Sequence, residues 1–508
     1  MRSKNALRNL SLYLLYEALI FVLGLIFPKF IILTYGSEIN GLTSTITRML
    51  SIINLIQAGA VGAAIFQMYK PVADGDYEMQ SSILFSSKKY YFKITFLYFV
   101  IAVVLSVIFS FRLSSSNLKF FEVFFAFFIL TLNGASTLLI TSICDIYISS
   151  HQKKYLLIIS LFANVFVHYG LLTVVLVFRL HFIFIYLSYL MGGIVNVVLN
   201  YVFYKKLSKG KITNNPKDKG FVIRDKKYLM LASVGNEAIT ASPPVIITMF
   251  IDLIQTSVFS IYSLVFTSMK TILNSIQLSI SPIFGNLVKT SDDNRISQVY
   301  DVIQFVTLLL GTICSCCVGF LLIPFVYVYT LKINDANYIY PILSVFVAIY
   351  IVLISFRASF GFVATVYGFF KKTCWITLAF GAIGILSSVV CIVFFGMPYV
   401  MVGLLTYELG CSISILIILK RGVPWFSLKK LITRFVVMIL LSSCSVATYL
   451  LLKPSISSWL EWIKWGVCVG LSTIAILAVY CLVFERKCLS QLIGYFKNLF
   501  RSKGKRAR

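Results

Sequence analysis

Four basic residues interrupt stretches of the chain that are otherwise apolar: Lys29, Arg48, Lys270 and Arg357. A cation within such a stretch persists only beside an opposite charge, in a wet cavity or against a ligand. Arginine can donate two parallel hydrogen bonds to phosphate oxygens and lysine provides a point charge, so a diphosphate is a suitable ligand. The alternative is a set of structural ion pairs with the acidic residues Glu17, Glu237, Asp252 and Glu408.

Polar residues at helical spacing accompany these cations. A stripe facing lipid would be costly, so we expect it to face protein or water. We predict that these side chains line a cavity, and the alternative is hydrogen bonding between packed helices. The predicted lining residues are Thr47, Asn54, Gln57, Thr267, Asn274 and Gln277.

An internal repeat relates the two groups of polar residues. When residues 17–57 are compared with residues 237–277, 13 of 41 positions are identical. Glu17 recurs as Glu237, and both lie near the inner ends of their predicted helices. We predict that this pair carries a coupling proton or cation, with a role in helix packing as the alternative.

The composition requires that these residues sit in a membrane. Apolar residues make up 59% of the 508 residues and charged residues only 12%. A soluble protein has about 45–50% apolar and about 25% charged residues, so a soluble enzyme is excluded. The sequence predicts an all-α polytopic membrane protein.

Fourteen apolar stretches have about the length of 20 residues that spans a bilayer. The second, seventh and eighth are the most polar. The predicted spans are 11–33, 41–68, 94–111, 120–143, 155–177, 182–203, 229–252, 258–287, 302–329, 341–367, 374–395, 398–419, 435–452 and 465–484.

The net charge of +27 follows the predicted topology. With the N-terminus inside, the inner segments carry 35 of the 45 Lys and Arg residues and the outer loops carry 6. Because cytoplasmic loops are enriched in Lys and Arg, both termini are predicted to be cytoplasmic. The charge therefore indicates topology and anionic lipid as a partner, and we expect no nucleic acid.

The repeat and the spans together predict the organisation of the chain. Six helices per repeat give two parallel copies, which form two lobes related by an axis along the membrane normal. The predicted parts are 1–204 (first lobe), 205–228 (basic cytoplasmic linker), 229–420 (second lobe), 421–484 (two appended helices) and 485–508 (basic amphipathic tail).

The chain has no motif for nucleotide or metal chemistry. The segment Ser208–Ile212 lacks the spacing and the hydroxyl of a phosphate-binding loop, and the eleven cysteines form no CxxC pair near histidines. We therefore expect a secondary transporter without a cofactor or metal, and no enzyme.

The first hundred residues resemble the opening of bacterial polysaccharide transport proteins, the Wzx-type flippases of the multidrug, oligosaccharidyl-lipid and polysaccharide exporter superfamily. The similarity lies in Phe27–Phe30, in Tyr35–Leu42 (YGSEINGL), in Tyr69–Pro71 and in the pair Lys88–Lys89. In the second of these segments we expect Gly36 and Gly41 to form a tight turn.

This resemblance implies a flippase that moves undecaprenyl-diphosphate-linked oligosaccharide from the inner to the outer leaflet of a bacterial cytoplasmic membrane. It implies alternating access with a cationic cavity, to which Arg48, Lys270, Arg357 and Lys29 are assigned by position. Partners would be the lipid-linked substrate, membrane lipids, a proton or sodium ion, and polysaccharide assembly enzymes. The alternatives are a multidrug or cation antiporter of the same superfamily and a lipid II flippase.

Overall fold

The computed structural model describes residues 2–54, 60–114, 118–213, 216, 227–452, 454, 456–486 and 488–491. Throughout these ranges the secondary structure is helical and contains no strand. The all-α prediction is confirmed. Most of the predicted tail, 485–508, lies outside the described residues.

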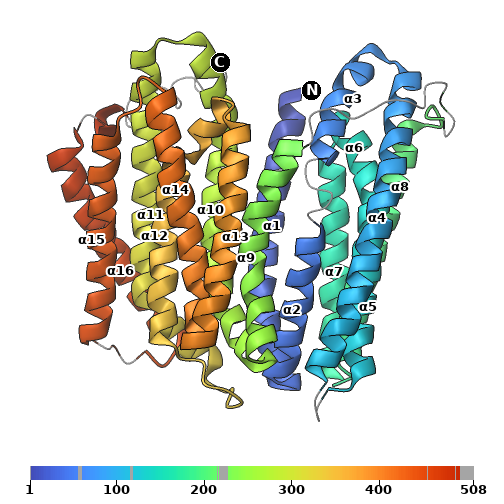
Figure 1. Ribbon diagram of the computed structural model, residues 1–508, viewed down its shortest axis with the longest axis horizontal. Coiled ribbons are helices and arrows are strands. Elements are labelled where there is room, and N and C mark those ends of the chain that lie inside the picture. Colours follow the sequence, from blue (N-terminus) through green and yellow to red (C-terminus); the bar gives the residue numbers. More distant parts are fainter. Residues whose placement is uncertain are drawn as a thin grey trace. The chain divides into compact units, whose positions relative to one another are not determined.

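The chain divides into two units, residues 1–257 and 258–508, with the boundary inside helix α10. In the first unit α4, α5, α7 and α8 stand side by side (Figure 1). The elements that begin in this unit are α1 (Arg2–Tyr35), α2 (Ser37–Asn54), α3 (Ala60–Asp74), α4 (Tyr77–Leu113), α5 (Phe120–Ser136), a π-helical turn (Thr137–Thr141), α6 (Ser142–Ser150), α7 (Tyr155–Val177), α8 (Ile183–Ser208), α9 (Lys227–Phe250) and α10 (Leu253–Thr290).

In the second unit α11 packs against α12, α15 and α16, and α13 packs against α14 (Figure 1). Its core includes Phe284, Tyr300, Phe356 and Phe360. The remaining elements are α11 (Asp293–Thr330), α12 (Pro341–Val366), α13 (Phe370–Phe395), a 3₁₀ turn (Met397–Val400), α14 (Met401–Gly422), α15 (Leu428–Leu452) and α16 (Trp459–Phe484).

Among the described residues, twelve helices are long and apolar enough to cross a membrane. The predicted spans 41–68 and 229–252 are not among them. The first of these spans contains most of α2 and the start of α3, and its residues 55–59 lie outside the described residues, so its continuity stays a prediction. The polar residues of α2 and α9 lower the mean hydropathy of these helices, so neither contains a stretch of 18 residues as apolar as those of the twelve. The total of fourteen spans stays a prediction.

Several helices are longer than the apolar stretches that predicted them. The third span was predicted at 94–111, but α4 runs from Tyr77 to Leu113. Its start is fixed by Asp76, whose carboxylate accepts a hydrogen bond from the backbone N–H of Met79 at 2.9 Å. Helical backbone hydrogen bonds form outside the lipid as well as within it. The helix can therefore begin at a cap in the polar segment, before the apolar stretch starts.

The turn between α1 and α2 gives the YGSEINGL segment a physical role. Gly36 has φ of 85°, a left-handed conformation that favours glycine, and it ends α1. Gly41 is not in the turn as expected. It lies inside α2, where an added Cβ would be 1.9 Å from the carbonyl oxygen of Leu253. The side-chain amide of Asn40 donates to Ser257 Oγ at 2.8 Å, so the segment seats α2 on the start of α10.

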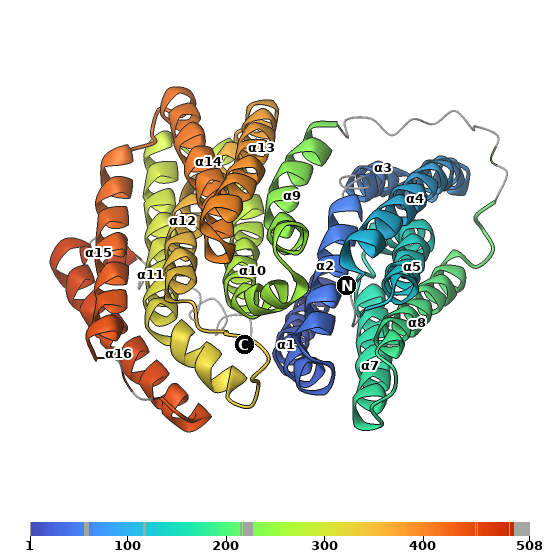
Figure 2. The ribbon, with the colours of Figure 1, turned by 60° about the horizontal axis from the view of Figure 1, so that its bottom comes forward.

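Helix α9 packs against α2 within the first unit (Figure 2). The contact includes a hydrogen bond of 2.6 Å between the hydroxyls of Thr45 and Thr248. Thr248 in turn bonds to Thr256 at 2.8 Å. This unit therefore includes one helix that the repeat assigns to the second lobe, while the lobes themselves stay a prediction.

Candidate functional site in the membrane helices

Arg357 of α12 forms an ion pair with Glu408 of α14. Its Nε lies 2.5 Å from Glu408 Oε2, and its Nη2 donates to Oε1 at 3.0 Å. The glutamate side chain is 0% exposed and the arginine side chain is 23% exposed. A guanidinium has five N–H donors, so this fork leaves donors for a further acceptor. The geometry is the ion pair that the sequence left open as an alternative, and it also keeps Arg357 partly accessible.

Two further residues surround this ion pair. The guanidinium carbon of Arg357 lies 5.5 Å from the ring centroid of Tyr407, within the range of a cation–π contact. On the neighbouring helix α10, Gln277 donates through Nε2 to the carbonyl oxygen of Ala358 at 2.8 Å. Gln277 is therefore used here to join α10 to α12, next to the arginine.

The other predicted residues of α10 have different surroundings. Lys270 is partly buried. Thr267 is also partly buried, and its hydroxyl donates to the carbonyl oxygen of Ser263 in the preceding turn. Asn274 is exposed.

In the first unit the structure brings together two predicted residues, Arg48 of α2 and Glu237 of α9. The two interact electrostatically, and Arg48 is partly buried while Glu237 is exposed. Thr47 donates to the carbonyl oxygen of Thr43 at 2.8 Å. Asn54 ends α2 and has a buried side-chain oxygen. Gln57 lies outside the described residues.

Lys29 and Glu17 both belong to α1 and are partly buried. Glu17 interacts with Tyr13 and Tyr16, which are its neighbours on the same helix. The structure therefore places Glu17 and Glu237 on different helices, each with its own partners. Among the described residues, no group of histidine, cysteine and acidic side chains has the arrangement of a metal site.

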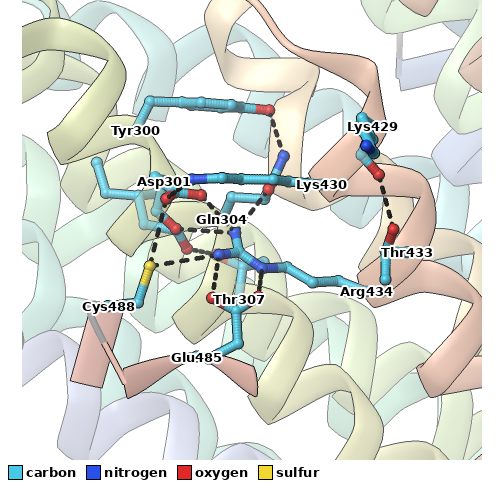
Figure 3. A network of polar contacts seen from close by, with 11 residues as sticks. Tyr300, Asp301, Gln304, Thr307, Lys429, Lys430, Thr433, Arg434, Glu485 and Cys488 are labelled. Atoms are coloured by element: carbon cyan, nitrogen blue, oxygen red, sulfur yellow. Dashed lines mark hydrogen bonds and ion pairs between the residues drawn. The ribbon is translucent and has the colours of Figure 1, made fainter. Parts of the chain in front are cut away.

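An extensive polar cluster was missed by the sequence reasoning. It surrounds Arg434 of α15, whose side chain is 2% exposed (Figure 3). Its Nε lies 2.7 Å from Glu485 Oε1 and its Nη2 donates to Oε2 at 2.8 Å. Its Nη1 lies 2.8 Å from Asp301 Oδ1 and donates to Gln304 Oε1 at 2.8 Å.

The cluster is completed by a lysine and a thiol. Lys430 Nζ lies 2.6 Å from Asp301 Oδ2, and Cys488 donates to the same oxygen at 3.3 Å. Desolvation and the neighbouring carboxylate of Asp301 raise the pKa of Cys488 to about 12, so the thiol keeps its proton. The cluster thereby ties α15 and the residue after α16 to α11.

The positions of three charged residues in the sequence indicate this cluster. Asp301, Arg434 and Glu485 each lie just outside the predicted spans 302–329, 435–452 and 465–484. The predicted spans place all three in inner segments. Three charged residues at the same predicted level of three helices, with opposite signs, indicate a buried network once the helices are known to be neighbours.

No protein-family model matches the sequence, and no curated protein matches it significantly. Solved structures do match. The lipid II flippase MurJ in an inward closed conformation has a TM-score of 0.64 and 14% identity, covering 93% of this chain and 100% of its own.

Transporters of the MATE family match as well. An inward-facing multidrug resistance MATE family transporter of the MOP superfamily has a TM-score of 0.62 and 9% identity, covering 85% of this chain and 99% of its own. A MATE protein in a bent conformation has a TM-score of 0.56 and 10% identity, covering 88% and 97%. The chain therefore has the fold seen in MATE transporters and in MurJ.

Proposed function

We propose that this protein is a flippase for undecaprenyl-diphosphate-linked oligosaccharides in a bacterial cytoplasmic membrane. The observation that carries the proposal is the fold, which is similar to MurJ over 93% of the chain and to the MATE transporters over 85–88%. The resemblance of the first hundred residues to Wzx-type flippases indicates the substrate, a lipid-linked oligosaccharide. Both termini would be cytoplasmic, and the product would be a capsule, exopolysaccharide, O-antigen or teichoic acid.

The match to MurJ covers 93% of this chain, and the match to the inward-facing MATE transporter covers 85%. The Arg434 cluster fixes α15 and the end of α16 to α11 with charged hydrogen bonds. These helices are thus an integral part of the second unit, and a translocator with a long prenyl cargo has a use for their additional apolar surface. Polysaccharide assembly enzymes would be partners at the cytoplasmic face.

In this proposal the diphosphate is bound by Arg48, Lys270, Arg357 and Lys29. Arg357 keeps donors that Glu408 does not occupy, but the ion pair cancels its charge. Lys270, which is partly buried, would add a second cation in the second unit. The polar residues Thr47, Asn54, Gln57, Thr267, Asn274 and Gln277 would contact the sugars or their water.

The energy source would be the membrane potential or an ion. Moving a net anion outward is favoured by an inside-negative potential, at about 2.3 kcal/mol per charge per 100 mV. The alternative to transport driven by the membrane potential is antiport of a proton or sodium ion through Glu17 or Glu237. If either glutamate couples, its replacement by glutamine abolishes the ion dependence of transport, and an unchanged dependence in both variants removes them from the mechanism.

The decisive experiment depletes the protein in its own host and extracts the lipid-linked saccharides. Their leaflet is then scored with a probe that reaches only the outer surface. Accumulation of complete diphosphate-linked repeat units in the inner leaflet supports the proposal and identifies the sugar. Normal repeat-unit pools together with sensitivity to cationic drugs would indicate a multidrug antiporter, and accumulation of lipid II would indicate a lipid II flippase.

The diphosphate-binding role is tested by charge reversal. Lys270→Glu should abolish export while the amount of folded protein stays normal. Lys289→Glu is the matched control, because Lys289 lies on the same helix but is exposed at its end. Normal export by the Lys270 variant would refute its role.

A further inference from the structure

Buried polar atoms without a hydrogen-bond partner are concentrated in the first unit. Thirteen such side-chain atoms belong to described residues 1–257, and Ser412 Oγ is a further one in residues 258–508. Serine and threonine hydroxyls in these helices normally bond to a carbonyl oxygen of the preceding turn. Ser106 and Ser110 of α4 do so at 2.7 and 2.6 Å. Ser87 and Thr95 of the same helix do not.

The unpartnered groups of α4 form one row. Ser87, Tyr91, Thr95 and Tyr98 are separated by four, four and three residues, which places them on one face of the helix. Each has a buried hydroxyl with no hydrogen-bond partner in the described structure. Ser87, Tyr91 and Tyr98 are 0% exposed. Their oxygens therefore point into the unit, away from lipid.

The Tyr98 end of this row meets α5 and α8. An added Cβ on Gly134 would lie 2.1 Å from Tyr98 Oη, and one on Gly193 would lie 1.7 Å from Asn133 Oδ1. Two glycines thus make room for two polar atoms from neighbouring helices. The side-chain oxygen of Asn133 is also buried without a partner.

The row continues against a π-helical turn. Because α4 and α5 run antiparallel, seven residues back from Tyr98 to Tyr91 corresponds to seven residues forward from Gly134 to Thr141. Thr141 closes the π-helical turn, and its hydroxyl is buried and unpartnered as well. Helix α4 contacts both this turn and α6. Such turns widen a helix and often occur at functional sites.

A carboxylate lies near the Ser87 end of the row. Asp145 of α6 interacts electrostatically with Tyr91 of the row. Asp145 is partly buried and accepts a hydrogen bond from Ser149. Next to Ser87 on α4 stand Lys88 and Lys89, which are exposed. This end of the row is thus polar, whereas the Tyr98 end lies in the apolar interior.

We propose that the seam between α4 and the α5–α6 helix binds a file of ordered water molecules. It would run from Asp145 and Ser87 to Tyr98 and Asn133, about 16 Å at the rise of an α-helix. A row of dry, unpaired hydroxyls is costly, and buried water typically satisfies such groups with two to four hydrogen bonds. The file gives water, and protons carried by it, access to the interior of the first unit.

Radiolytic footprinting of the purified protein tests this directly, because hydroxyl radicals formed from bound water oxidise adjacent side chains. Tyr91 and Tyr98 should be oxidised several-fold faster than Tyr186. Tyr186 is equally buried, at 0% exposure, but its hydroxyl is paired with Thr43. The exposed Tyr77 gives the upper limit. Oxidation of Tyr91 and Tyr98 at the rate of Tyr186 would overturn the proposal.

A second measurement uses an isosteric variant. Thr95→Val removes a hydroxyl and keeps the shape. In a dry seam this removes an unpaired polar group and raises the melting temperature. In a hydrated seam it strands water and lowers the melting temperature, which is the result we expect. Ser110→Ala is the control on the same helix, because its hydroxyl bonds to its own backbone.

Discussion

Replacing Arg357 with methionine separates a structural ion pair from an accessory phosphate-binding cation. Glu408 is 0% exposed, so the variant leaves a carboxylate in the interior without its two contacts from the guanidinium. Breaking a buried pair in this way costs about 3–5 kcal/mol. The reverse variant, Glu408→Gln, should cost less, about 1–2 kcal/mol, because Arg357 is 23% exposed and the glutamine oxygen still accepts a hydrogen bond.

The double variant Arg357→Met with Glu408→Gln completes the cycle. It buries no charge, so it should be more stable than Arg357→Met alone, with a coupling energy of about 2–3 kcal/mol. The assay is the free energy of unfolding in mixed micelles at constant pH, with export measured in parallel. Lys289→Met is the control, because Lys289 is exposed at the end of α10 and its loss should change the free energy by no more than about 0.5 kcal/mol.

The outcomes of this cycle are distinct. If Arg357 serves mainly to stabilise the bundle, the double variant recovers both stability and export. If Arg357 also binds the diphosphate, the double variant recovers stability but not export. Additive effects of the two substitutions would refute the inferred coupling between Arg357 and Glu408 altogether.

Three further predictions concern other parts of the chain. Arg434→Lys keeps the charge but loses the guanidinium fork that holds two carboxylates, so we expect the free energy of unfolding to fall by about 2–3 kcal/mol. Lys430→Met, at an exposed side chain, should lower it by less than about 1 kcal/mol. Equal effects in thermal unfolding would contradict the central role of Arg434 in the cluster. Gly41→Ala should destabilise the protein by about 1–3 kcal/mol because its methyl group meets backbone, while Gly24→Ala, with open space around it, should not, as melting temperatures will show. Burial lowers the pKa of His151, so this imidazole is protonated at a higher pH in the unfolded chain than in the folded protein, and stability falls as the pH drops below about 6.5. His151→Asn should make stability less dependent on pH in this range. An unchanged dependence of stability on pH would exclude this contribution.

The sequence alone determined the all-α membrane class and most of the spans. Apolar runs such as 155–177 coincide with their helix because lipid requires every backbone group of a span to be paired internally. The same reasoning missed the true length of the helix at 94–111, which continues beyond the apolar run. In α4 a cap at Asp76 extends the helix by seventeen residues before the predicted start.

The tertiary structure decided which charges meet. Charge and spacing identified Arg357 and Glu408 as intramembrane ions, but only the packing of α12 against α14 makes them partners. The Arg434 cluster joins residues separated by up to 187 positions, and no local pattern encodes such a contact. Hydropathy is a property of neighbours along the chain, whereas the pairing of buried charges depends on which helix faces come together in space.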